Sequence, residues 1–434
     1  MYRSFMYILY SLLLACGLVL TLPWWIFQML RSGKYRAGLK ERLGFVPERT
    51  RKTVRPGAVW IHAVSVGEVL AVTALVRELQ NANPEKQILV STTTLTGQYL
   101  ARGRFGEDKA FFLPIDSGIC IRPYLNRLRP SMLILAETEF WPNLLHLIKK
   151  RGAAIAAVNA RISDRSFPRY RRFRWFFSRV LGQIDLFLAQ TQEDAQRLIA
   201  IGAPAERVQV SGNLKFDVHP SVSTALTDDL RQALAPDSPV IVCGSTAEGE
   251  EPILLKAFQE CLQKYPAAVM VLAPRHPERF DAVAESISSL QIPLVRRSSW
   301  NGSRRVSGCV FLLDSVGELA SIYALASVAF VGGSLLPLGG HNILEPAQHG
   351  VAIMTGPYTF NFREIIRLFV QDEALRTVTP ETLSQELLAL LQDGQQRKLV
   401  GNRARELFTR YSGATRKTLE ALQPLFQEKG RRRQ

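Results

Sequence analysis

The segment SVAFVGGSLLPLGGHNILEPAQHG, residues 327–350, has the pattern of a buried strand that breaks at a Gly-Gly pair (332–333). It then loops through a second pair (339–340) and enters a helix near Asn342. Pro346 limits how early the helix can begin, because a proline beyond the first turn costs an amide hydrogen bond. N–H groups that open a helix lack partners and attract phosphate. The segment therefore predicts an anion site, or alternatively a strand-to-helix connection whose glycines serve tight packing.

Short apolar runs alternate with helical stretches on both sides of this segment, for example AVWIHAV (58–64) before a helix and PVIVCGS (239–245) before another. Continuous apolar strands are typical of parallel sheets that helices cover on both faces. We therefore expect an α/β fold with two doubly wound, Rossmann-like domains facing one another. The expected boundaries are an anchor at 1–31, domains at 32–220 and 237–410, a polar linker at 221–236, and a helix with a basic tail at 411–434.

The net charge of +16 is unevenly distributed over the 434 residues. Residues 1–220 hold 31 Lys and Arg against 16 Asp and Glu, a net charge of +15, whereas residues 221–434 hold 23 against 22, a net charge of +1. A basic surplus of this kind indicates either nucleic acid or an anionic membrane as a partner.

The run from Phe5 to Leu30 contains no charged residue and is long enough to cross a hydrocarbon core, which needs about 20 apolar residues. Basic residues, among them Arg31, Lys34 and Arg36, follow it, so the positive-inside rule predicts an N-terminal anchor with the remaining chain in the cytoplasm. A cleaved signal is disfavoured because the apolar run continues past the LLAC stretch. A helix that lies in the membrane surface stays an alternative, because Gly17 and Pro23 interrupt the run.

Cysteine and histidine spacing gives no sign of a metal centre. The five cysteines are scattered without metal-ligand or redox spacing, and the six histidines form no HExxH pattern. We therefore expect reduced cysteines, no bound metal and no other cofactor.

Three polar residues follow predicted strands of the first half. Glu68 lies in the first turn of a helix and could take a proton from a hydroxyl, although capping its own helix is the commoner role. Glu137 leaves the strand SMLILAE together with Glu139, and two acids indicate a hydroxyl-rich or cationic ligand. Lys215 follows a strand close to the expected linker and could neutralise an anion, or could simply be solvated.

Strand ends of the second half offer a complementary set. Arg275 ends LAPRHPER (272–279), Gly317 and Glu318 open another helix, and GGHNILEP (339–346) is the third. Together these turns could hold a base, a ribose and a phosphate. No GxxxxGK[ST] loop or GxGxxG turn is present, so nucleoside triphosphatase and dinucleotide-binding activities are disfavoured.

Taken together, HAVSVGE, ETEFWPN, NARISDRS, GNLKFD, APRHPER, FVGGS and GGHNILEPA resemble the 3-deoxy-D-manno-octulosonic acid (Kdo) transferases of lipopolysaccharide assembly. The resemblance runs from the apolar segment to about residue 410. It implies a fold of the GT-B type, whose two domains face a central cleft. It also implies an inverting, metal-independent transfer of Kdo from CMP-Kdo to an acylated, phosphorylated lipid A precursor at the cytoplasmic side of the cell inner membrane, with anionic membrane lipids as further partners.

The resemblance also implies roles for individual residues. Glu68 is the expected general base, and Glu137 and Lys215 are expected to stabilise the transition state. The expected CMP-binding residues are Pro274, Arg275, Val316, Gly317, Glu318, Asn342, Ile343, Leu344 and Glu345.

Two other readings stay open at this point. A sugar-nucleotide epimerase or hydrolase can use the same kind of two-domain fold. A membrane-tethered nucleic-acid binder would explain the basic segment 169–179, but leaves the glycine-opened turns of the second half unexplained, so we expect no nucleic-acid partner. Under the transferase reading, Arg161, Arg165 and the 169–179 segment are candidate acceptor contacts, or else a solvated basic face.

Overall fold

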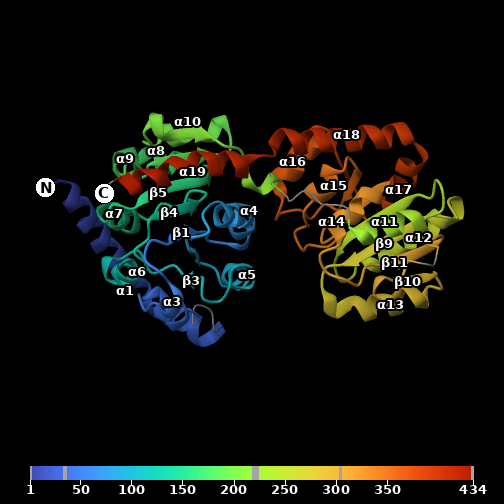
Figure 1. Ribbon diagram of the computed structural model, residues 1–434, viewed down its shortest axis with the longest axis horizontal. Helices are drawn as coiled ribbons and strands as arrows, with labels where there is room; N and C mark the ends of the chain where they lie inside the picture. The colour runs from blue at the N-terminus through green and yellow to red at the C-terminus, as the bar shows by residue number, and fades with distance from the viewer. Residues whose placement is uncertain (1, 33–36, 218–223, 303–304, 432–434) are drawn as a thin grey trace. The chain divides into compact units, whose positions relative to one another are not determined.

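A computed structural model describes residues 2–32, 37–217, 224–302 and 305–431 of the chain, and Figure 1 shows its elements. The chain divides into two compact units: unit 1 comprises Met1–Asp217 and Ser412–Gln434, and unit 2 comprises Val218–Tyr411. Three features of the sequence argument lie outside the described residues: Lys34 and Arg36 after the apolar segment, the start of the expected linker (221–223), and the end of the tail (432–434).

Unit 1 is built on a parallel sheet with the strand order β3-β2-β1-β4-β5-β6-β7. Helices cover both faces of the sheet (Figure 1). Its helices are α1 (Tyr2–Ser32), α2 (Leu39–Arg42), α3 (Glu48–Thr53), α4 (Val66–Ala82), α5 (Leu95–Phe105), α6 (Gly118–Leu128), α7 (Pro142–Lys150), α8 (Phe167–Arg172), α9 (Arg174–Leu181), α10 (Gln192–Ala200) and α19 (Ala414–Arg431). Its strands are β1 (Val59–His62), β2 (Ile88–Thr92), β3 (Ala110–Phe112), β4 (Met132–Ala136), β5 (Ala154–Ala160), β6 (Leu186–Ala189) and β7 (Val208–Val210), with short 3-10 turns η1 (Ala205–Arg207) and η2 (Leu214–Phe216).

Unit 2 has a second parallel sheet, with the order β10-β11-β9-β8-β12-β13-β14. Its helices are α11 (Ala225–Ala233), α12 (Glu251–Lys264), α13 (Phe280–Ser289), α14 (Leu319–Ile322), α15 (Leu344–Gln348), α16 (Arg363–Gln371), α17 (Leu383–Gln392) and α18 (Gly394–Tyr411). Its strands are β8 (Val240–Thr246), β9 (Val269–Pro274), β10 (Leu294–Arg296), β11 (Cys309–Leu312), β12 (Val328–Val331), β13 (Ala352–Thr355) and β14 (Arg376–Thr377), with 3-10 turns η3 (Pro277–Arg279), η4 (Arg297–Ser299) and η5 (Tyr323–Leu325).

Each sheet has a switch point, and this point fixes where a ligand can bind. In unit 1 the strands follow chain order outward in both directions from the pair β1 and β4. In unit 2 they run outward from the pair β8 and β12, except that β11 lies inside β10 at one edge of the sheet. In doubly wound sheets, ligands bind beyond the carboxyl ends of the strands at this switch point. The α/β prediction with two doubly wound sheets is confirmed, and each sheet directs attention to one such crevice.

The buried pattern of the sequence explains why these elements form. All five residues of β4 are buried, as expected for a strand that has helices on both faces. Helix α4 buries Val69, Val72, Leu75 and Leu79 at helical spacing against the same sheet. Burying one such side chain stabilises the fold by about 1.5–3 kcal/mol, so a charged residue at position 75 would detach α4 from the sheet.

Two features differ from the sequence argument. Residues 225–233, expected within a linker, form α11, because Thr224 caps the helix and Leu226 and Leu230 lie one turn apart and are buried in the core of unit 2. Helix α19 belongs to unit 1, where Leu422 is fully buried against the sheet.

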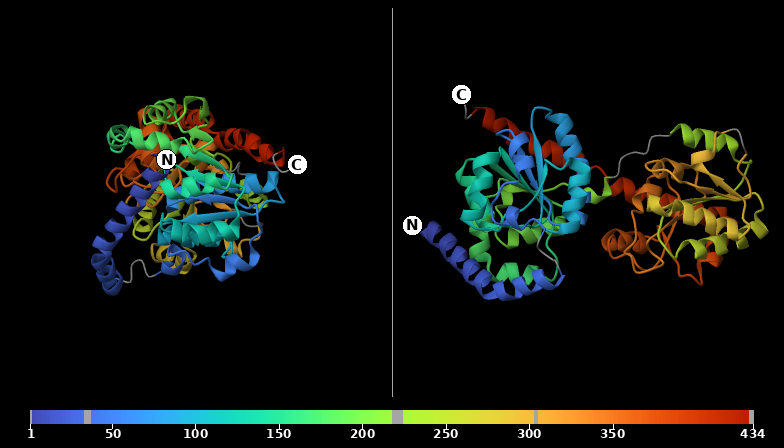
Figure 2. Two further views of the ribbon diagram at one scale, coloured as in Figure 1. Left: turned by 90° about the vertical axis from the view of Figure 1, so that its left-hand side faces the viewer. Right: turned by 90° about the horizontal axis from the view of Figure 1, so that it is seen from below.

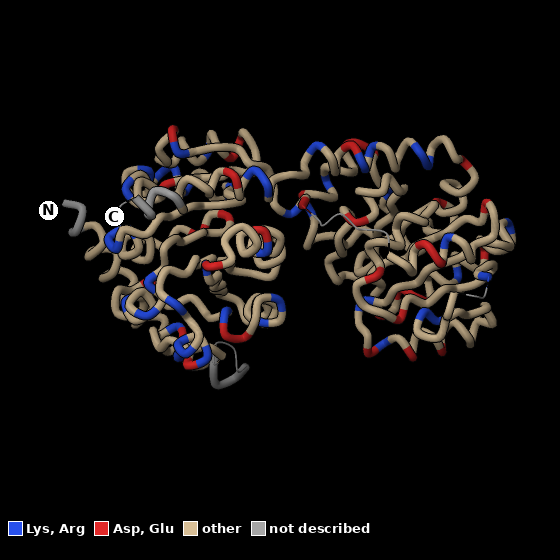
Figure 3. Tube along the Cα trace, in the orientation of Figure 1, with Lys and Arg blue, Asp and Glu red and all other residues tan. Residues whose placement is uncertain are grey.

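The return of the C-terminal segment to unit 1 sharpens the charge division. Unit 1 holds 37 Lys and Arg against 18 Asp and Glu, a net charge of +19, whereas unit 2 holds 17 against 20, a net charge of −3. Figure 3 shows where these charged residues lie along the chain. The excess positive charge of the chain therefore belongs to unit 1.

Candidate active site

Glu68 lies at the switch point of unit 1, just after β1. It is the third residue of α4, is only 8% exposed, and folds back over the helix start. One carboxylate oxygen accepts a hydrogen bond from the Val64 amide (2.7 Å), and the other accepts one from the Ser65 hydroxyl (3.3 Å). The capping role that the sequence argument set beside the catalytic one is therefore present, and it holds the carboxylate in one position.

The environment of Glu68 changes its acidity. Burial raises its pKa to about 7, the Val64 hydrogen bond opposes this, and the nearby charges of Glu137 and Glu139 raise the pKa further. A carboxylate with this pKa is half ionised at neutral pH and is suited to accept a proton from a hydroxyl.

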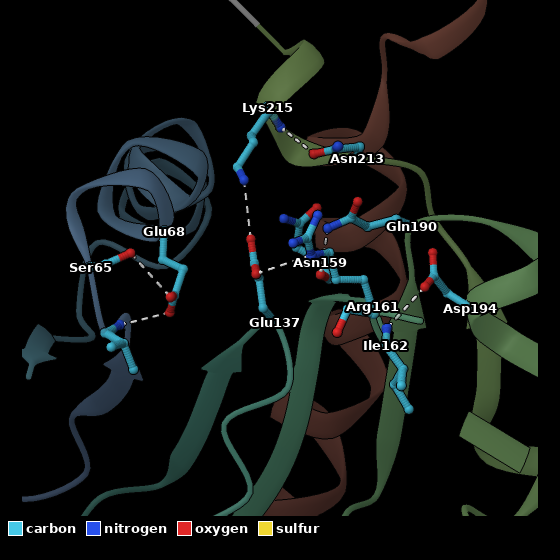
Figure 4. Close-up of polar contacts among 12 residues, drawn as sticks. Ser65, Glu68, Glu137, Asn159, Arg161, Ile162, Gln190, Asp194, Asn213 and Lys215 are labelled. Carbon is cyan, nitrogen blue, oxygen red and sulfur yellow. Dashed lines mark hydrogen bonds and ion pairs between the residues drawn. The ribbon is translucent and has the colours of Figure 1, made fainter. Parts of the chain in front are cut away.

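Glu137 follows β4, the strand next to β1, and has a left-handed backbone with φ = 57°. Its carboxylate bridges two cations: one oxygen lies 3.2 Å from Lys215 Nζ and the other 3.5 Å from Arg161 Nε. Figure 4 shows Glu137 between Glu68 on one side and Arg161 on the other, with Lys215 reaching it from η2. The structure thus brings together the three residues for which the sequence predicted chemistry.

Asn159 supports this arrangement, although the sequence argument did not single it out. It lies within β5, has φ = 54°, and is fully buried. Its side-chain oxygen accepts a hydrogen bond from the Leu214 amide (2.9 Å), and its carbonyl accepts one from the Gln190 side chain (3.0 Å). The Asn213 side chain then caps Lys215 (3.0 Å), so the turn that carries the lysine is fixed at two points. Left-handed non-glycine residues at adjacent strand ends are a form of strain that clusters at functional sites.

Glu139 lies beyond the same strand, two residues after Glu137. Burial and the neighbouring Glu137 charge raise its pKa above the usual range. It therefore acts on the site through its charge, which contributes to the raised pKa of Glu68.

The switch point of unit 2 is organised by a residue that the sequence argument missed. Glu250 follows β8, is fully buried, and accepts hydrogen bonds from the amides of Gly333 (2.7 Å), Ser334 (2.8 Å) and Leu335 (2.9 Å) in the turn after β12. It also accepts one from Ala247 (2.9 Å). The acidic run AEGEE (247–251) drew no attention because acids before a helix are common, so only the fold reveals this contact.

The opening segment, 327–350, is thereby corrected in part. Strand β12 ends before the first Gly-Gly pair and α15 begins at Leu344, as predicted. However, the amides of residues 333–335 bind Glu250 and that of Leu344 binds the Asn342 side chain, so these four N–H groups are already used. For the helix-opening Leu344 amide, the predicted lack of a partner was therefore wrong. The amides of residues 333–335 are not available to a phosphate, because a buried carboxylate already accepts their hydrogen bonds.

The glycines of this segment serve close packing. A Cβ atom at Gly332 would lie 2.6 Å from the Ser245 carbonyl oxygen, and one at Gly333 would lie 2.8 Å from the His341 ring. Both contacts are too short for any larger residue. The packing alternative given in the sequence analysis accounts for these positions.

The remaining unit 2 candidates lie at the carboxyl ends of neighbouring strands. Pro274 ends β9, and the exposed Arg275 follows it. Burial raises the pKa of Glu345, and the Arg275 charge opposes this rise. Burial also lowers the pKa of His341 to about 4, and the Arg275 charge adds to that decrease. Arg275 therefore lies within electrostatic reach of the segment that contains Asn342, Ile343, Leu344 and Glu345.

The turn after β11 differs in character. Val316 is 79% exposed, and a Cβ at Gly317 would meet no atom within 4 Å. Glu318 is bound by Arg297 (3.0 and 3.2 Å) and by the Ser315 hydroxyl; burial raises its pKa, but these hydrogen bonds hold it below the usual range. The turn is thus an open surface with a fixed carboxylate acceptor. Within the described ranges, no three His, Cys, Asp or Glu side chains are grouped as ligands for a metal.

Comparisons with known proteins agree with this geometry. Residues 37–218 match the family model described as 3-deoxy-D-manno-octulosonic-acid transferase (kdotransferase). The chain is 37% identical to a 3-deoxy-D-manno-octulosonic acid transferase of Haemophilus influenzae over 91% of its own length and 93% of that protein, and 36% identical to one of Bordetella pertussis over 84% and 86%. Among solved structures, a putative UDP-N-acetylglucosamine 2-epimerase from Listeria monocytogenes superposes with a TM-score of 0.50 at 15% identity, covering 86% of this chain and 98% of that one, which indicates a shared GT-B-like fold. On its sequence identity to these relatives, the chain belongs to the Kdo transferase family.

Proposed function

We propose that the protein transfers Kdo from CMP-Kdo to the sugar hydroxyl of an acylated, phosphorylated lipid A precursor in lipopolysaccharide biosynthesis, and releases CMP. Family membership supports the class of reaction. The observation that carries the mechanism is the buried Glu68 carboxylate, whose pKa of about 7 suits it to deprotonate an alcohol.

In the proposed reaction, Glu68 takes the proton of the acceptor hydroxyl as its oxygen attacks the anomeric carbon of Kdo. The bond between that carbon and the phosphate oxygen of CMP breaks, and CMP leaves with the electron pair. Attack opposite the leaving group inverts the anomeric centre. The fixed capping contacts of Glu68 keep the carboxylate oriented for this step.

Lys215 is proposed to stabilise the negative charge of the transition state, with Glu137 as its positioning partner. The 3.2 Å contact between the two holds a flexible ammonium in one place, and the Asn213 cap fixes the turn that carries it. A cation that is positioned before the reaction needs no reorganisation as charge develops, which makes such a group effective.

CMP is proposed to bind unit 2 through Pro274 and Arg275, the turn Val316–Glu318 and the segment 342–345. The Arg275 guanidinium would meet the phosphate, because it is an exposed, planar cation at the end of β9. The fixed Glu318 carboxylate would accept hydrogen bonds from ribose hydroxyls or the base. We further propose that no metal ion takes part, so that Arg275 and backbone dipoles neutralise the leaving phosphate.

The acceptor is proposed to meet unit 1 at the cytoplasmic side of the inner membrane. The +19 charge of this unit fits a phosphorylated lipid in an anionic bilayer. One helix among the described residues, with its window at Met6–Trp25, is long and apolar enough to cross a membrane. Arg161, Arg165 and the 169–179 segment are the proposed acceptor contacts, and no nucleic acid is a proposed partner.

The test is product analysis with purified full-length protein, CMP-Kdo and a tetra-acylated lipid A precursor, in buffer with and without EDTA. The expected products are a Kdo-bearing lipid and one equivalent of CMP per Kdo, unchanged by EDTA. Release of free Kdo without lipid product would show a hydrolase instead, and loss of transfer in EDTA would contradict the metal-independent mechanism.

A further inference from the structure

The first turns of α1 are docked on unit 1 by polar contacts. The Tyr10 hydroxyl donates a hydrogen bond to Asp116 (3.0 Å), and Ser11 exchanges hydrogen bonds with the Asn143 side chain (3.0 and 3.3 Å). The Tyr7 ring stacks on His146 with centroids 4.1 Å apart. Figure 2 shows α1, in dark blue, running beside the helices of unit 1.

Asp116 makes this contact specific. It is 2% exposed, and it also accepts hydrogen bonds from the amides of Asn143 (3.0 Å) and Leu144 (2.8 Å) at the start of α7. Burial raises its pKa to about 6, while these hydrogen bonds lower it. Tyr10 and Ser11 form hydrogen bonds with polar side chains of unit 1, so the first turns of α1 pack on that unit. If these turns lay in hydrocarbon, both side chains would lose their hydrogen-bond partners.

The chain after α1 is held by the same unit. The backbone at Gly38 packs against the Phe112 ring so closely that an added Cβ would overlap it, and the Arg42 guanidinium lies 4.5 Å from the centre of that ring. Only six residue steps join Ser32 to Gly38, a reach of at most about 22 Å. A hydrocarbon core is about 30 Å thick, so the chain cannot cross it and return within this connection.

The part of α1 between these attachments is apolar and exposed. Residues 15–24 are exposed on every side of the helix, with Val19 at 68% and Leu20 at 81%. An all-round apolar helix requires an apolar medium. The surface next to α1 indicates the nature of this medium. Tyr10 contacts Phe176 of α9 (6.1 Å between ring centroids), so α9 and the preceding α8 lie beside α1. Helices α8 and α9 present the exposed Trp175 and a set of arginines, namely Arg169, Arg171, Arg172, Arg174 and Arg179.

We propose that α1 does not cross the membrane but lies within one leaflet of an anionic bilayer, with both of its ends on the side of the catalytic unit. The exposed apolar length of the helix occupies the hydrocarbon, and the arginines and Trp175 of α8 and α9 lie at the headgroups beside it. This selects the surface-lying alternative over the spanning anchor that the positive-inside rule predicts. The assignment of the catalytic unit to the cytoplasmic side of the membrane rests on the proposed function. The docking of α1 on unit 1 does not.

A cross-linking experiment in native membranes tests the docking. In full-length protein with the exposed Cys16 changed to Ser, Ser11→Cys and Asn143→Cys place two thiols where side chains are now 3.0 Å apart. Mild oxidation of intact membranes should join most of the protein. The matched pair Leu20→Cys and Asn143→Cys should not join, because position 20 lies nine residues, about 13 Å, further along the helix. A helix that crosses the bilayer would leave Ser11→Cys and Asn143→Cys unjoined until detergent is added, which would overturn the proposal.

Transfer activity of each variant shows whether it has folded, and a reporter that fluoresces only when folded in the cytoplasm provides a second readout. Fused ahead of Met1, it should fluoresce; a dark fusion that still reaches the membrane would place the N-terminus on the far side and overturn the proposal. Absence of transfer in the wild-type protein, with cross-linking intact in the Ser11→Cys and Asn143→Cys pair, would count against the proposed function alone.

The apolar medium is tested by a bimane label on Leu20→Cys in vesicles of anionic phospholipid. Brominated acyl chains should quench it severalfold, and should not quench the same label on Tyr99→Cys, which is exposed on α5. An unquenched label at position 20, or a label shielded by a second copy of the chain in a cross-linked dimer, would contradict a lipid partner.

Discussion

The two switch points of this molecule have the same topology but use their carboxylates differently. In unit 1, Glu68 after β1 and Glu137 after β4 each keep their own contacts, with the second held by Lys215 and Arg161. In unit 2, Glu250 after β8 reaches across to the turn after β12 and binds three of its amides. The switch point of unit 1 thus carries carboxylates next to cations, whereas at the switch point of unit 2 a carboxylate holds the backbone of the neighbouring turn in place.

This difference fits the proposed division of roles, in which unit 1 carries out the chemistry and unit 2 binds CMP. A carboxylate that accepts four amide hydrogen bonds has no capacity left for a substrate, so Glu250 acts through the loop that it positions. Glu68, with two partners and a pKa of about 7, retains the capacity to accept a proton. The following variants would break or sharpen that contrast.

The largest effect is expected for Glu68→Gln. The amide oxygen can still accept the Val64 hydrogen bond, so the helix cap persists while the base is lost. We expect kcat to fall by roughly 10²–10⁴, with CMP affinity unchanged. Steady-state transfer assays and calorimetric titration with CMP measure the two quantities. Glu78→Gln on the same helix is the control, and near wild-type turnover in Glu68→Gln would show that the base lies elsewhere.

The second effect concerns stability and loop geometry in unit 2. Glu250→Ala leaves four buried amides without a partner, which we expect to lower the stability of unit 2 by about 3 kcal/mol. Its unfolding midpoint should fall and its CMP affinity should weaken as the turn after β12 relaxes. Glu260→Ala on the same helix should stay within about 0.5 kcal/mol of the wild type. If the two variants melted alike, Glu250 would not organise the crevice.

The alternation of apolar strands and helices was sufficient to predict both sheets, because strands buried on two faces have a composition that few other elements share. Residues 225–233 were assigned to a linker because their polar content hid Leu226 and Leu230, which are only two buried positions. Nothing local could show that α19 packs on unit 1, since that contact joins residues far apart in the chain.

The candidate site was predictable where the position of a residue depends on a strand end, as for Glu68, Glu137 and Lys215, whose catalytic roles stay predictions. It was not predictable where function depends on conformation or on partners. The left-handed backbones of Glu137 and Asn159 leave no mark on the sequence beyond the mild preference of Asn for that region. Glycines that approach a phosphate and glycines that approach a carbonyl also look the same, and only the structure assigns Gly332 to the second group.

The third prediction addresses the binding side of the comparison. Arg275→Ala removes an exposed cation near Glu345 and is expected to weaken CMP binding about tenfold to a hundredfold, as loss of a charge-assisted hydrogen bond does. Affinity for cytidine, which lacks the phosphate, should change little. Arg231→Ala, an exposed arginine on α11, is the control. Equal CMP affinity in Arg275→Ala and wild type would remove Arg275 from the proposed phosphate contact.

The smallest effect is a shift of the pH dependence of kcat/KM. It tests whether the negative charges near Glu68 raise the pKa of this carboxyl group. The base must be ionised, so below its pKa of about 7 the value of kcat/KM should fall about tenfold for each unit of pH. Glu139→Gln removes a negative charge that raises this pKa, and the acid limb should therefore move to lower pH. At pH 6 the variant should retain about two to three times more of its maximal rate than the wild type. A decrease of about 0.3–0.5 in the pKa increases the ionised fraction of Glu68 by about that factor. A profile that stays in place, or moves to higher pH, would mean that Glu68 does not set the acid limb, since removal of a neighbouring negative charge can only make this carboxyl more acidic.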